Sequence, residues 1–167
     1  DSSDDDWQQV GWRGIMFDGG RMWLDAQQRM RALNESSAAE VARRNAIIER
    51  DRNALAASLQ DYAEPILRWQ TKSYRIRIDR MRDGGLRYMS WRRGSPLHAK
   101  PDLQLLHGMH EFDGAGGNHH YEWLQGKQSY RCVITLLGSG ESVPFELEVR
   151  RGEEVLQAEA GTTYYPK

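Results

Sequence analysis

The chain has 167 residues, enough for one domain with a substantial core and too few for two large domains. Its 23 basic and 24 acidic residues give a formal net charge of −1, so no global field would attract a nucleic acid or an anionic membrane. The hydrophobic fraction of 39% supports a packed globule, and no apolar run approaches the roughly 20 residues of a membrane span.

Residues 1–21 are predicted to form a flexible acidic tether followed by an arm. The first six residues are four aspartates and two serines, as in a tether left after the removal of an export signal. An artificially trimmed chain would have the same appearance. The apolar but unperiodic stretch that ends at Gly20 indicates an arm that lies on the main body.

A helical region is predicted over residues 22–68. One stripe, at spacings of three and four, predicts a short helix that residues 34–37 break: Trp23, Ala26, Met30 and Leu33. Ser37 and Glu40 fit a capping box, so a long helix is expected over about residues 37–63, before Pro65. A second stripe repeats every seven residues at Val41, Ile48, Leu55 and Tyr62, and Leu59 and Ile66 belong to the same stripe. Polar residues interrupt it, which favours packing on a sheet or in a helical hairpin over an extended coiled coil.

From Tyr74 onward the hydrophobic period changes to two, which predicts strands. The sequence Asp83-Gly84-Gly85 is typical of a tight hairpin turn before residues 86–91. Further strands are predicted over residues 102–106, 119–124, 128–137, 143–150 and 154–158. About seven short strands over residues 73–160 indicate an antiparallel β-sandwich or barrel, and the fold class is therefore α+β.

Charge is unevenly spread along this β region. Residues 71–100 carry nine basic and two acidic residues, whereas residues 141–160 carry six acidic and two basic residues. Arginine and glutamate on neighbouring strands could pair across a solvent face. The alternative is an exposed cationic face that meets an acidic partner.

Side chains able to carry chemistry are present without a diagnostic arrangement. The single cysteine, Cys132, lies in an alternating apolar segment and is predicted to be a buried, inert thiol. The histidines at 107 and 110 would lie on opposite faces of a strand, which argues against a zinc site. The glycine-rich residues 113–118 lack the ligand spacing of a calcium loop, and Ser139 lies in no nucleophile elbow. We expect no metal, no cofactor and no enzymatic activity.

Aromatic and arginine residues cluster over residues 87–93, and two further aromatic residues, Tyr121 and Trp123, follow later in the chain. Such residues anchor protein interfaces, although in a small β domain they also form the core and its rim. We predict that partner contacts come from this segment and from the glycine-rich loop: Arg87, Tyr88, Trp91, Arg92, Arg93, Asp113, Asn118 and His119.

Four segments carry a resemblance to a known group: Arg87-Tyr88-Met89-Ser90-Trp91, Lys100-Pro101-Asp102-Leu103, the stretch over residues 117–123, and Tyr130-Arg131-Cys132. Together they resemble short exported bacterial proteins and lipoproteins, some of which are similar to periplasmic immunity proteins against secreted antibacterial effectors. The resemblance spans about residues 74–156 and assigns no catalytic residue. It implies a periplasmic location, a cognate effector enzyme as the protein partner, and a lipid anchor upstream of the given chain.

The sequence thus favours a non-catalytic periplasmic binding or inhibitor protein that blocks the active cleft of an effector. A second hypothesis is an envelope structural or assembly module that oligomerises through the long helix. A third is a metal-dependent hydrolase that uses the histidines.

Overall fold

The structure is a computed structural model that describes residues 21–114, 116–138 and 142–163. The predicted tether and arm, up to residue 20, lie outside the described residues. The chain divides into two units, Asp1–Ile47 and Ile48–Lys167, and each is described by itself. Among the helices that the structure describes, none combines the length and apolar character that spanning a membrane requires.

A single helix, α2 (Arg21–Asn53), occupies the described part of the first unit and extends into the second. The break predicted at residues 34–37 is wrong, because the helix runs through that segment. None of these four residues is glycine or proline, and each costs at most about 0.7 kcal/mol relative to alanine inside a helix. Ser37 therefore lies within the helix instead of capping it. All described side chains between residues 30 and 47 are exposed.

The C-terminal end of α2 also differs from the prediction. The helix ends at Asn53 and not near residue 63, and the Ala54 amide donates to the Asp51 carbonyl as the last turn tightens. A short 3-10 helix, η2 (Ala57–Leu59), follows. The turn between the two helices places three residues of the predicted helical stripe in a small core: Leu55, Leu59 and Tyr62.

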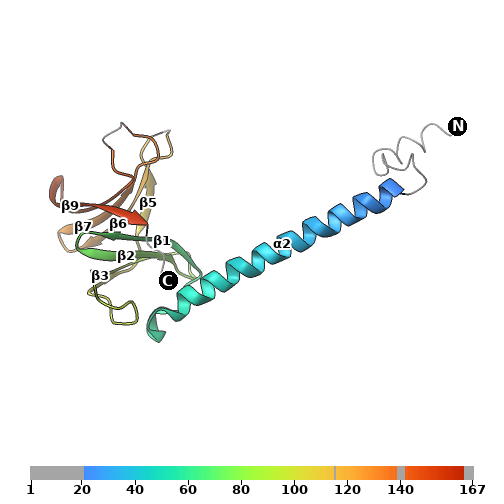
Figure 1. Ribbon diagram of the computed structural model, residues 1–167. Helices are drawn as coiled ribbons and strands as arrows, with labels where there is room; N and C mark the ends of the chain where they lie inside the picture. The colour runs from blue at the N-terminus through green and yellow to red at the C-terminus, as the bar shows by residue number, and fades with distance from the viewer. Residues whose placement is uncertain (1–20, 115, 139–141, 164–167) are drawn as a thin grey trace. The chain divides into compact units, whose positions relative to one another are not determined.

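Nine strands form one antiparallel sheet in the order β4-β3-β2-β1-β9-β8-β7-β6-β5 (Figure 1). Their bounds are β1 (Glu64–Thr71), β2 (Tyr74–Arg80), β3 (Leu86–Arg92), β4 (Leu103–Leu105), β5 (Met109–Phe112), β6 (His119–Gln125), β7 (Gln128–Ile134), β8 (Phe145–Arg151) and β9 (Glu154–Thr163). The α+β class is confirmed. The sheet is open, so the predicted sandwich or closed barrel is wrong, and nine strands replace the predicted seven.

The two additional strands are β1 and β5. Pro65 lies at the second position of β1, where a register shift between Pro65 and Leu67 accommodates it. The predicted helical region, residues 22–68, therefore ends in a strand. All four residues of β5 are exposed. Its sequence, Met-His-Glu-Phe, lacks the alternation of apolar and polar residues that predicts a strand.

The hairpin predicted at residues 83–85 is confirmed. β2 and β3 pair antiparallel, from Tyr74 opposite Arg92 to Arg80 opposite Leu86. Gly84 adopts a φ of +86°, which side-chain-bearing residues rarely adopt. The turn residue therefore helps to set the register of β2 and β3.

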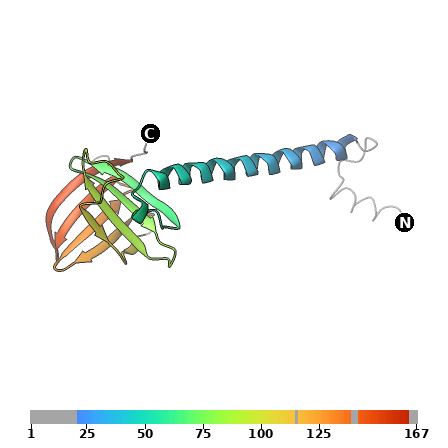
Figure 2. The ribbon, with the colours of Figure 1, turned by 90° about the horizontal axis from the view of Figure 1, so that it is seen from below.

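Strong curvature makes the two halves of the sheet face each other (Figure 2). We call β1–β4 the first wing and β5–β8 the second wing; β9 pairs with both β1 and β8. Aromatic rings meet across the wings, with 5.4 Å between the centroids of Tyr88 and Trp123. The indole of Trp123 donates to the Leu86 carbonyl at 3.1 Å. The main core lies between the wings.

Cys132 lies in this core with no exposed surface, which confirms the prediction of a buried thiol. Burial raises the pKa of Cys132 well above its usual range, so the thiol stays protonated at physiological pH.

Candidate partner-binding surface

The eight predicted contact residues divide into buried and accessible groups. Arg87, Tyr88 and Trp91 are only 2%, 1% and 0% exposed, so the expectation that they form a surface is wrong. β3 is covered on both faces, because the second wing packs on one face and η2 on the other. The residues that retain accessible surface are Arg92, Arg93, Asp113, Asn118 and His119.

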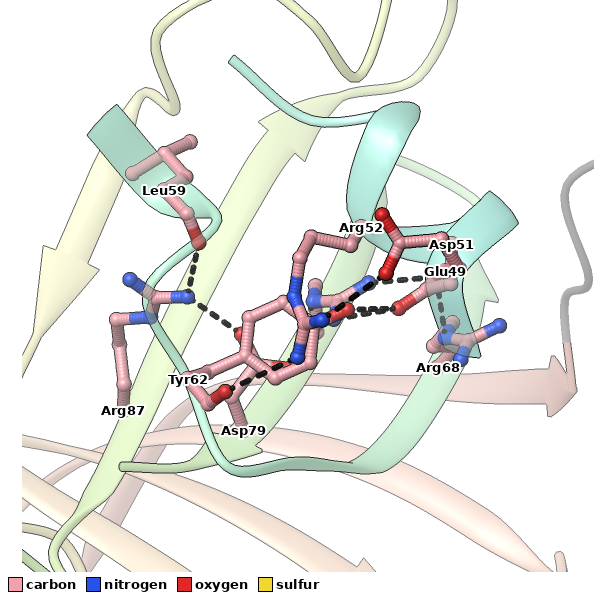
Figure 3. A network of polar contacts seen from close by, with 9 residues as sticks. Glu49, Asp51, Arg52, Leu59, Tyr62, Arg68, Asp79 and Arg87 are labelled. Carbon is pink, nitrogen blue, oxygen red and sulfur yellow. Dashed lines mark hydrogen bonds and ion pairs between the residues drawn. The ribbon is translucent and has the colours of Figure 1, made fainter. Parts of the chain in front are cut away.

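Arg87 belongs to a buried network of charges that sequence reasoning missed (Figure 3). Its guanidinium donates to Asp79 Oδ2 and to the Leu59 carbonyl, both at 2.7 Å. Asp79 also accepts from Arg77 Nε at 2.7 Å. Arg77 in turn contacts both carboxylate oxygens of Asp51, at 2.8 and 2.7 Å. The network therefore joins the last turn of α2 to β2 and β3.

Tyr62 also belongs to this network, through contacts with Asp51 and Arg77. Its hydroxyl donates to Asp51 Oδ2 at 2.7 Å, and the Arg77 guanidinium lies 4.7 Å from the centroid of its ring. Burial, with the hydrogen bond to Asp51, raises the pKa of Tyr62 to about 12. Burial opposes the charge of Arg77, but Asp51 and Asp79 outweigh it and raise the pKa of Arg77. These groups serve as partners for one another, which is a structural role.

Several arginines of the basic segment, residues 71–100, form ion pairs with acidic residues of α2, β1, β2 and the turn between η2 and β1. The pairs are Arg77–Asp51, Arg77–Asp79, Arg80–Glu64, Arg82–Asp61 and Arg87–Asp79.

Asp113 and Asn118 lie in the loop between β5 and β6, and His119 is the first residue of β6. The Asp113 amide donates to the Asn118 carbonyl at 2.7 Å. The Asn118 side chain accepts from the amides of Leu136 and Leu137 at 2.8 and 2.9 Å and donates to the Leu137 carbonyl at 2.8 Å. One amide side chain thereby fixes the loop to the segment after β7.

The histidines fall into two environments on this hairpin. His120 is buried, with Nδ1 2.8 Å from Asp113 Oδ2, and Arg131 donates to its Nε2 at 2.9 Å. This arrangement requires the proton on Nδ1. His110 stacks on Tyr121 with 4.3 Å between ring centroids. In the parts of the chain that the structure describes, no three His, Cys, Asp or Glu side chains converge to hold a metal ion.

An aromatic margin lies where β5 ends the sheet. His110 pairs with Tyr121 and Phe112 with His119, so these four side chains share one face of β5 and β6. Tyr121 belongs to the main core, which makes this the inner face of the second wing. Phe112 is nonetheless 69% exposed. The inner face therefore continues beyond the core into solvent, and we call His110, Phe112, His119 and Tyr121 the aromatic margin.

Burial favours the uncharged forms of two rings in the aromatic margin, His110 and Tyr121. Partial burial, with smaller effects from His119, Arg80 and His120, lowers the pKa of His110. Burial also raises the pKa of Tyr121. The margin can therefore be covered by apolar or aromatic groups without burying a charge on either of these rings.

No protein-family model, curated protein or solved structure matches this chain. The candidate surface therefore stands on its geometry.

Proposed function

We propose that this chain is a non-catalytic periplasmic binding protein that blocks a secreted antibacterial effector by accepting an extended segment of that effector along β5. The second wing would then gain a strand from the partner, and the attached body of the effector would be held against the hairpin of β5 and β6. Occlusion of the effector's active cleft is the proposed mode of inhibition. A lipid anchor upstream of the given chain would hold the inhibitor at the membrane.

The observation that carries this proposal is the exposure of the inner face of β5 at an open edge. β5 is the last strand in the sheet order, and outer backbone groups of such a strand are available to pair with another chain. Phe112 continues the apolar inner face with 69% of its surface exposed. In strand addition the main chain supplies affinity, and alternate side chains supply specificity.

Preorganisation of the loop beside β5 supports the same surface. Asn118 fixes the loop to the backbone of Leu136 and Leu137, and both leucines have exposed side chains. A loop that is already held in place loses little conformational entropy when a partner binds. The exposed ends of Leu136 and Leu137 would add apolar contact area beside the partner strand.

The test begins with the neighbouring genes, among which we expect one that encodes a secreted enzyme, and it uses that enzyme with the full chain. We expect the two purified proteins to form a complex and the enzyme to lose activity in it. Phe112→Lys should weaken the complex by about tenfold or more, because a lysine on an edge strand opposes pairing and removes the aromatic contact. Calorimetric titration measures the affinity, and an enzyme assay measures inhibition.

The matched control is Gln104→Lys on β4, the opposite edge of the sheet, where Gln104 is also exposed. This variant should bind within about twofold of the unchanged protein. The proposal fails if the purified pair does not associate, or if both lysine variants bind alike. Equal unfolding temperatures of the two variants would show that a difference in affinity does not arise from folding.

Oligomerisation through α2 is a second candidate function, favoured by the exposure of every described side chain between residues 30 and 47. Most helical stability in proteins comes from tertiary packing, so a long exposed helix favours a packing partner. Val41→Glu and Ile47→Glu should convert an oligomer to monomers in light-scattering measurements. A monomeric unchanged protein would exclude this function. Leu55 is unsuitable for the test because it is buried in the small core.

A further inference from the structure

A cavity of about 440 Å³ lies between the two wings, away from the aromatic margin. Its walls come from the start of β2, the end of β3 and β4 on one side, and from β7, β8 and β9 on the other. This volume lies within the roughly 300–1,000 Å³ of small-molecule sites, which occur preferentially in the mouths of curved β structures. A molecule bound here would contact both wings.

The inner part of the cavity is aromatic and apolar. Tyr88 is 1% exposed, and its ring centroid lies 5.9 Å from that of Tyr130. Leu147, also buried, completes this part of the wall. Burial raises the pKa of Tyr88 far above its usual range, with Cys132, Tyr130 and Tyr74 adding to the effect. The phenol therefore remains a hydrogen-bond donor at any physiological pH.

The outer part of the cavity is polar and carries no net charge. Arg92 and Asp102 contribute opposite charges, and Asp102 Oδ2 accepts from the Arg92 backbone amide at 2.7 Å. Gln128 and Gln157 supply amide groups, and the Gln157 nitrogen donates to Glu159 at 2.8 Å. The Gln157 nitrogen is thus engaged by Glu159, and the Gln157 carbonyl oxygen is an acceptor. Donors and acceptors are thus mixed around the opening.

We propose that this cavity binds a small uncharged saccharide. Each hydroxyl group of a sugar both donates and accepts, which matches a lining that contains guanidinium, carboxylate, amide and phenol groups. Its C–H faces can lie against the ring of Tyr130, which retains accessible surface whereas Tyr88 lies behind it at 1% exposure. An ionic ligand would meet balanced charges and would lose its hydration without a compensating partner. The site is independent of β5, so either proposal can fail without the other.

The test titrates the full chain with glucose, cellobiose and N,N′-diacetylchitobiose, each up to about 10 mM. Tyrosine and tryptophan fluorescence reports binding, and the unfolding temperature should rise with ligand concentration because only the folded state binds. At least one of these sugars should saturate the signal. Failure of all three to saturate it would overturn the proposal.

Substitutions locate the binding in the cavity. Arg92→Met and Tyr130→Phe should each weaken binding about fivefold or more, because they remove hydrogen-bonding groups from the lining and retain most of its volume. Arg93→Met is the matched control, since Arg93 is the exposed neighbour of Arg92 and its guanidinium donates to the Thr71 carbonyl. The control should bind within about twofold of the unchanged protein.

Equal affinities of the Arg92→Met and Arg93→Met variants would overturn the location of the site. Glucuronic acid provides the test of ligand charge and should bind no more tightly than glucose at neutral pH. Tighter binding of the anion would overturn the proposed ligand class. Arg92 is exposed, so its variant remains informative if Tyr130→Phe lowers stability.

Discussion

Two charged residues of β2 are buried, although the alternation of apolar and polar residues in this strand predicts that they face solvent. Arg77 and Asp79 alternate with Ile76 and Ile78, a pattern that is typical of a strand with one solvent face. In the structure all four are buried, because η2 and the end of α2 cover the second face. Burying these charges is tolerable because each ion has an opposite charge at hydrogen-bond distance.

Removal of one charge from this network should be strongly destabilising. Asp79→Asn leaves Arg77 and Arg87 without the buried carboxylate, which we expect to lower the free energy of unfolding by about 3–5 kcal/mol. Urea denaturation measures the change. The control, Asp61→Asn, breaks a pair whose side chains are 69% and 80% exposed, and it should cost less than about 1 kcal/mol. Equal losses would contradict the structural role of the network.

Glu159 should make part of the stability depend on acidity. Burial opposes its charge, but hydrogen bonds from Ser73, Thr71 and Gln157 outweigh burial and lower its pKa below 4.5. The carboxylate therefore stabilises the fold above about pH 4.5, and this contribution is lost as the pH falls through the lowered pKa. After allowance for solvent screening, Glu159→Gln should cost about 1 kcal/mol at pH 7.

Denaturation curves at pH 7 and pH 3 provide the measurement for Glu159. The difference between the unchanged protein and Glu159→Gln should shrink at the lower pH. Glu153→Gln, in the exposed turn between β8 and β9, should leave stability nearly unchanged at both values. A difference for Glu159→Gln that stays constant with pH would show that the carboxylate charge is not responsible.

At the scale of elements, the apolar stripe of residues 41–62 does not lie on one helix, contrary to the prediction. Leu55, Leu59 and Tyr62 have helical spacing, but the chain turns after Asn53 and buries them through η2 and the following turn. No glycine or proline between residues 54 and 63 marks the end of α2, so tertiary packing determines where the helix ends. Local sequence alone could not indicate which face would be covered.

Two leucines with different surroundings test this arrangement. Leu59, in η2, is 5% exposed, whereas Leu33, in α2, is 64% exposed. Leu59→Ala should lower the free energy of unfolding by about 2–5 kcal/mol, because it leaves a cavity in the small core. Leu33→Ala should change it by less than about 0.5 kcal/mol. Similar losses in thermal or urea unfolding would contradict the description of the two environments.

Strands are predictable where apolar and polar residues alternate or where turn residues are explicit. β2, β7 and β8 have the alternation, and the hairpin turn at Gly84 marks the start of β3. β1 was missed because Pro65 was interpreted only as a helix terminator. The candidate site was predicted in part: Asp113, Asn118 and His119 do lie together, but β5, which completes the surface, is too short and too exposed to show a period.

At the scale of the whole molecule, the sequence could predict local hairpins and not the global strand order. β1 pairs with β9, although most of the β region separates them in the chain. Such a pairing depends on the curvature of the complete sheet, which no short pattern encodes. The same curvature creates both the aromatic margin and the cavity between the wings.

The division of the chain after Ile47 makes a further prediction. A protein that begins at residue 48 retains Asp51 and both cores, so it should unfold within about 3 °C of the full chain while losing most of the helical signal in circular dichroism. A protein that begins at residue 54 lacks Asp51, the partner of Arg77, and should be much less stable. Failure of the longer fragment to fold would show that residues 1–47 are needed.

The central place of β9 has a consequence during synthesis. β1 emerges from the ribosome first among the described strands and β9 last, yet the two are neighbours in the middle of the sheet. Until β9 is made, the nascent chain can form each wing by local pairing but cannot join the wings through their shared strand. A chain that stops before β9 would leave β1 and β8 as two additional unpaired edge strands, so premature termination near the end would make the β domain prone to aggregation.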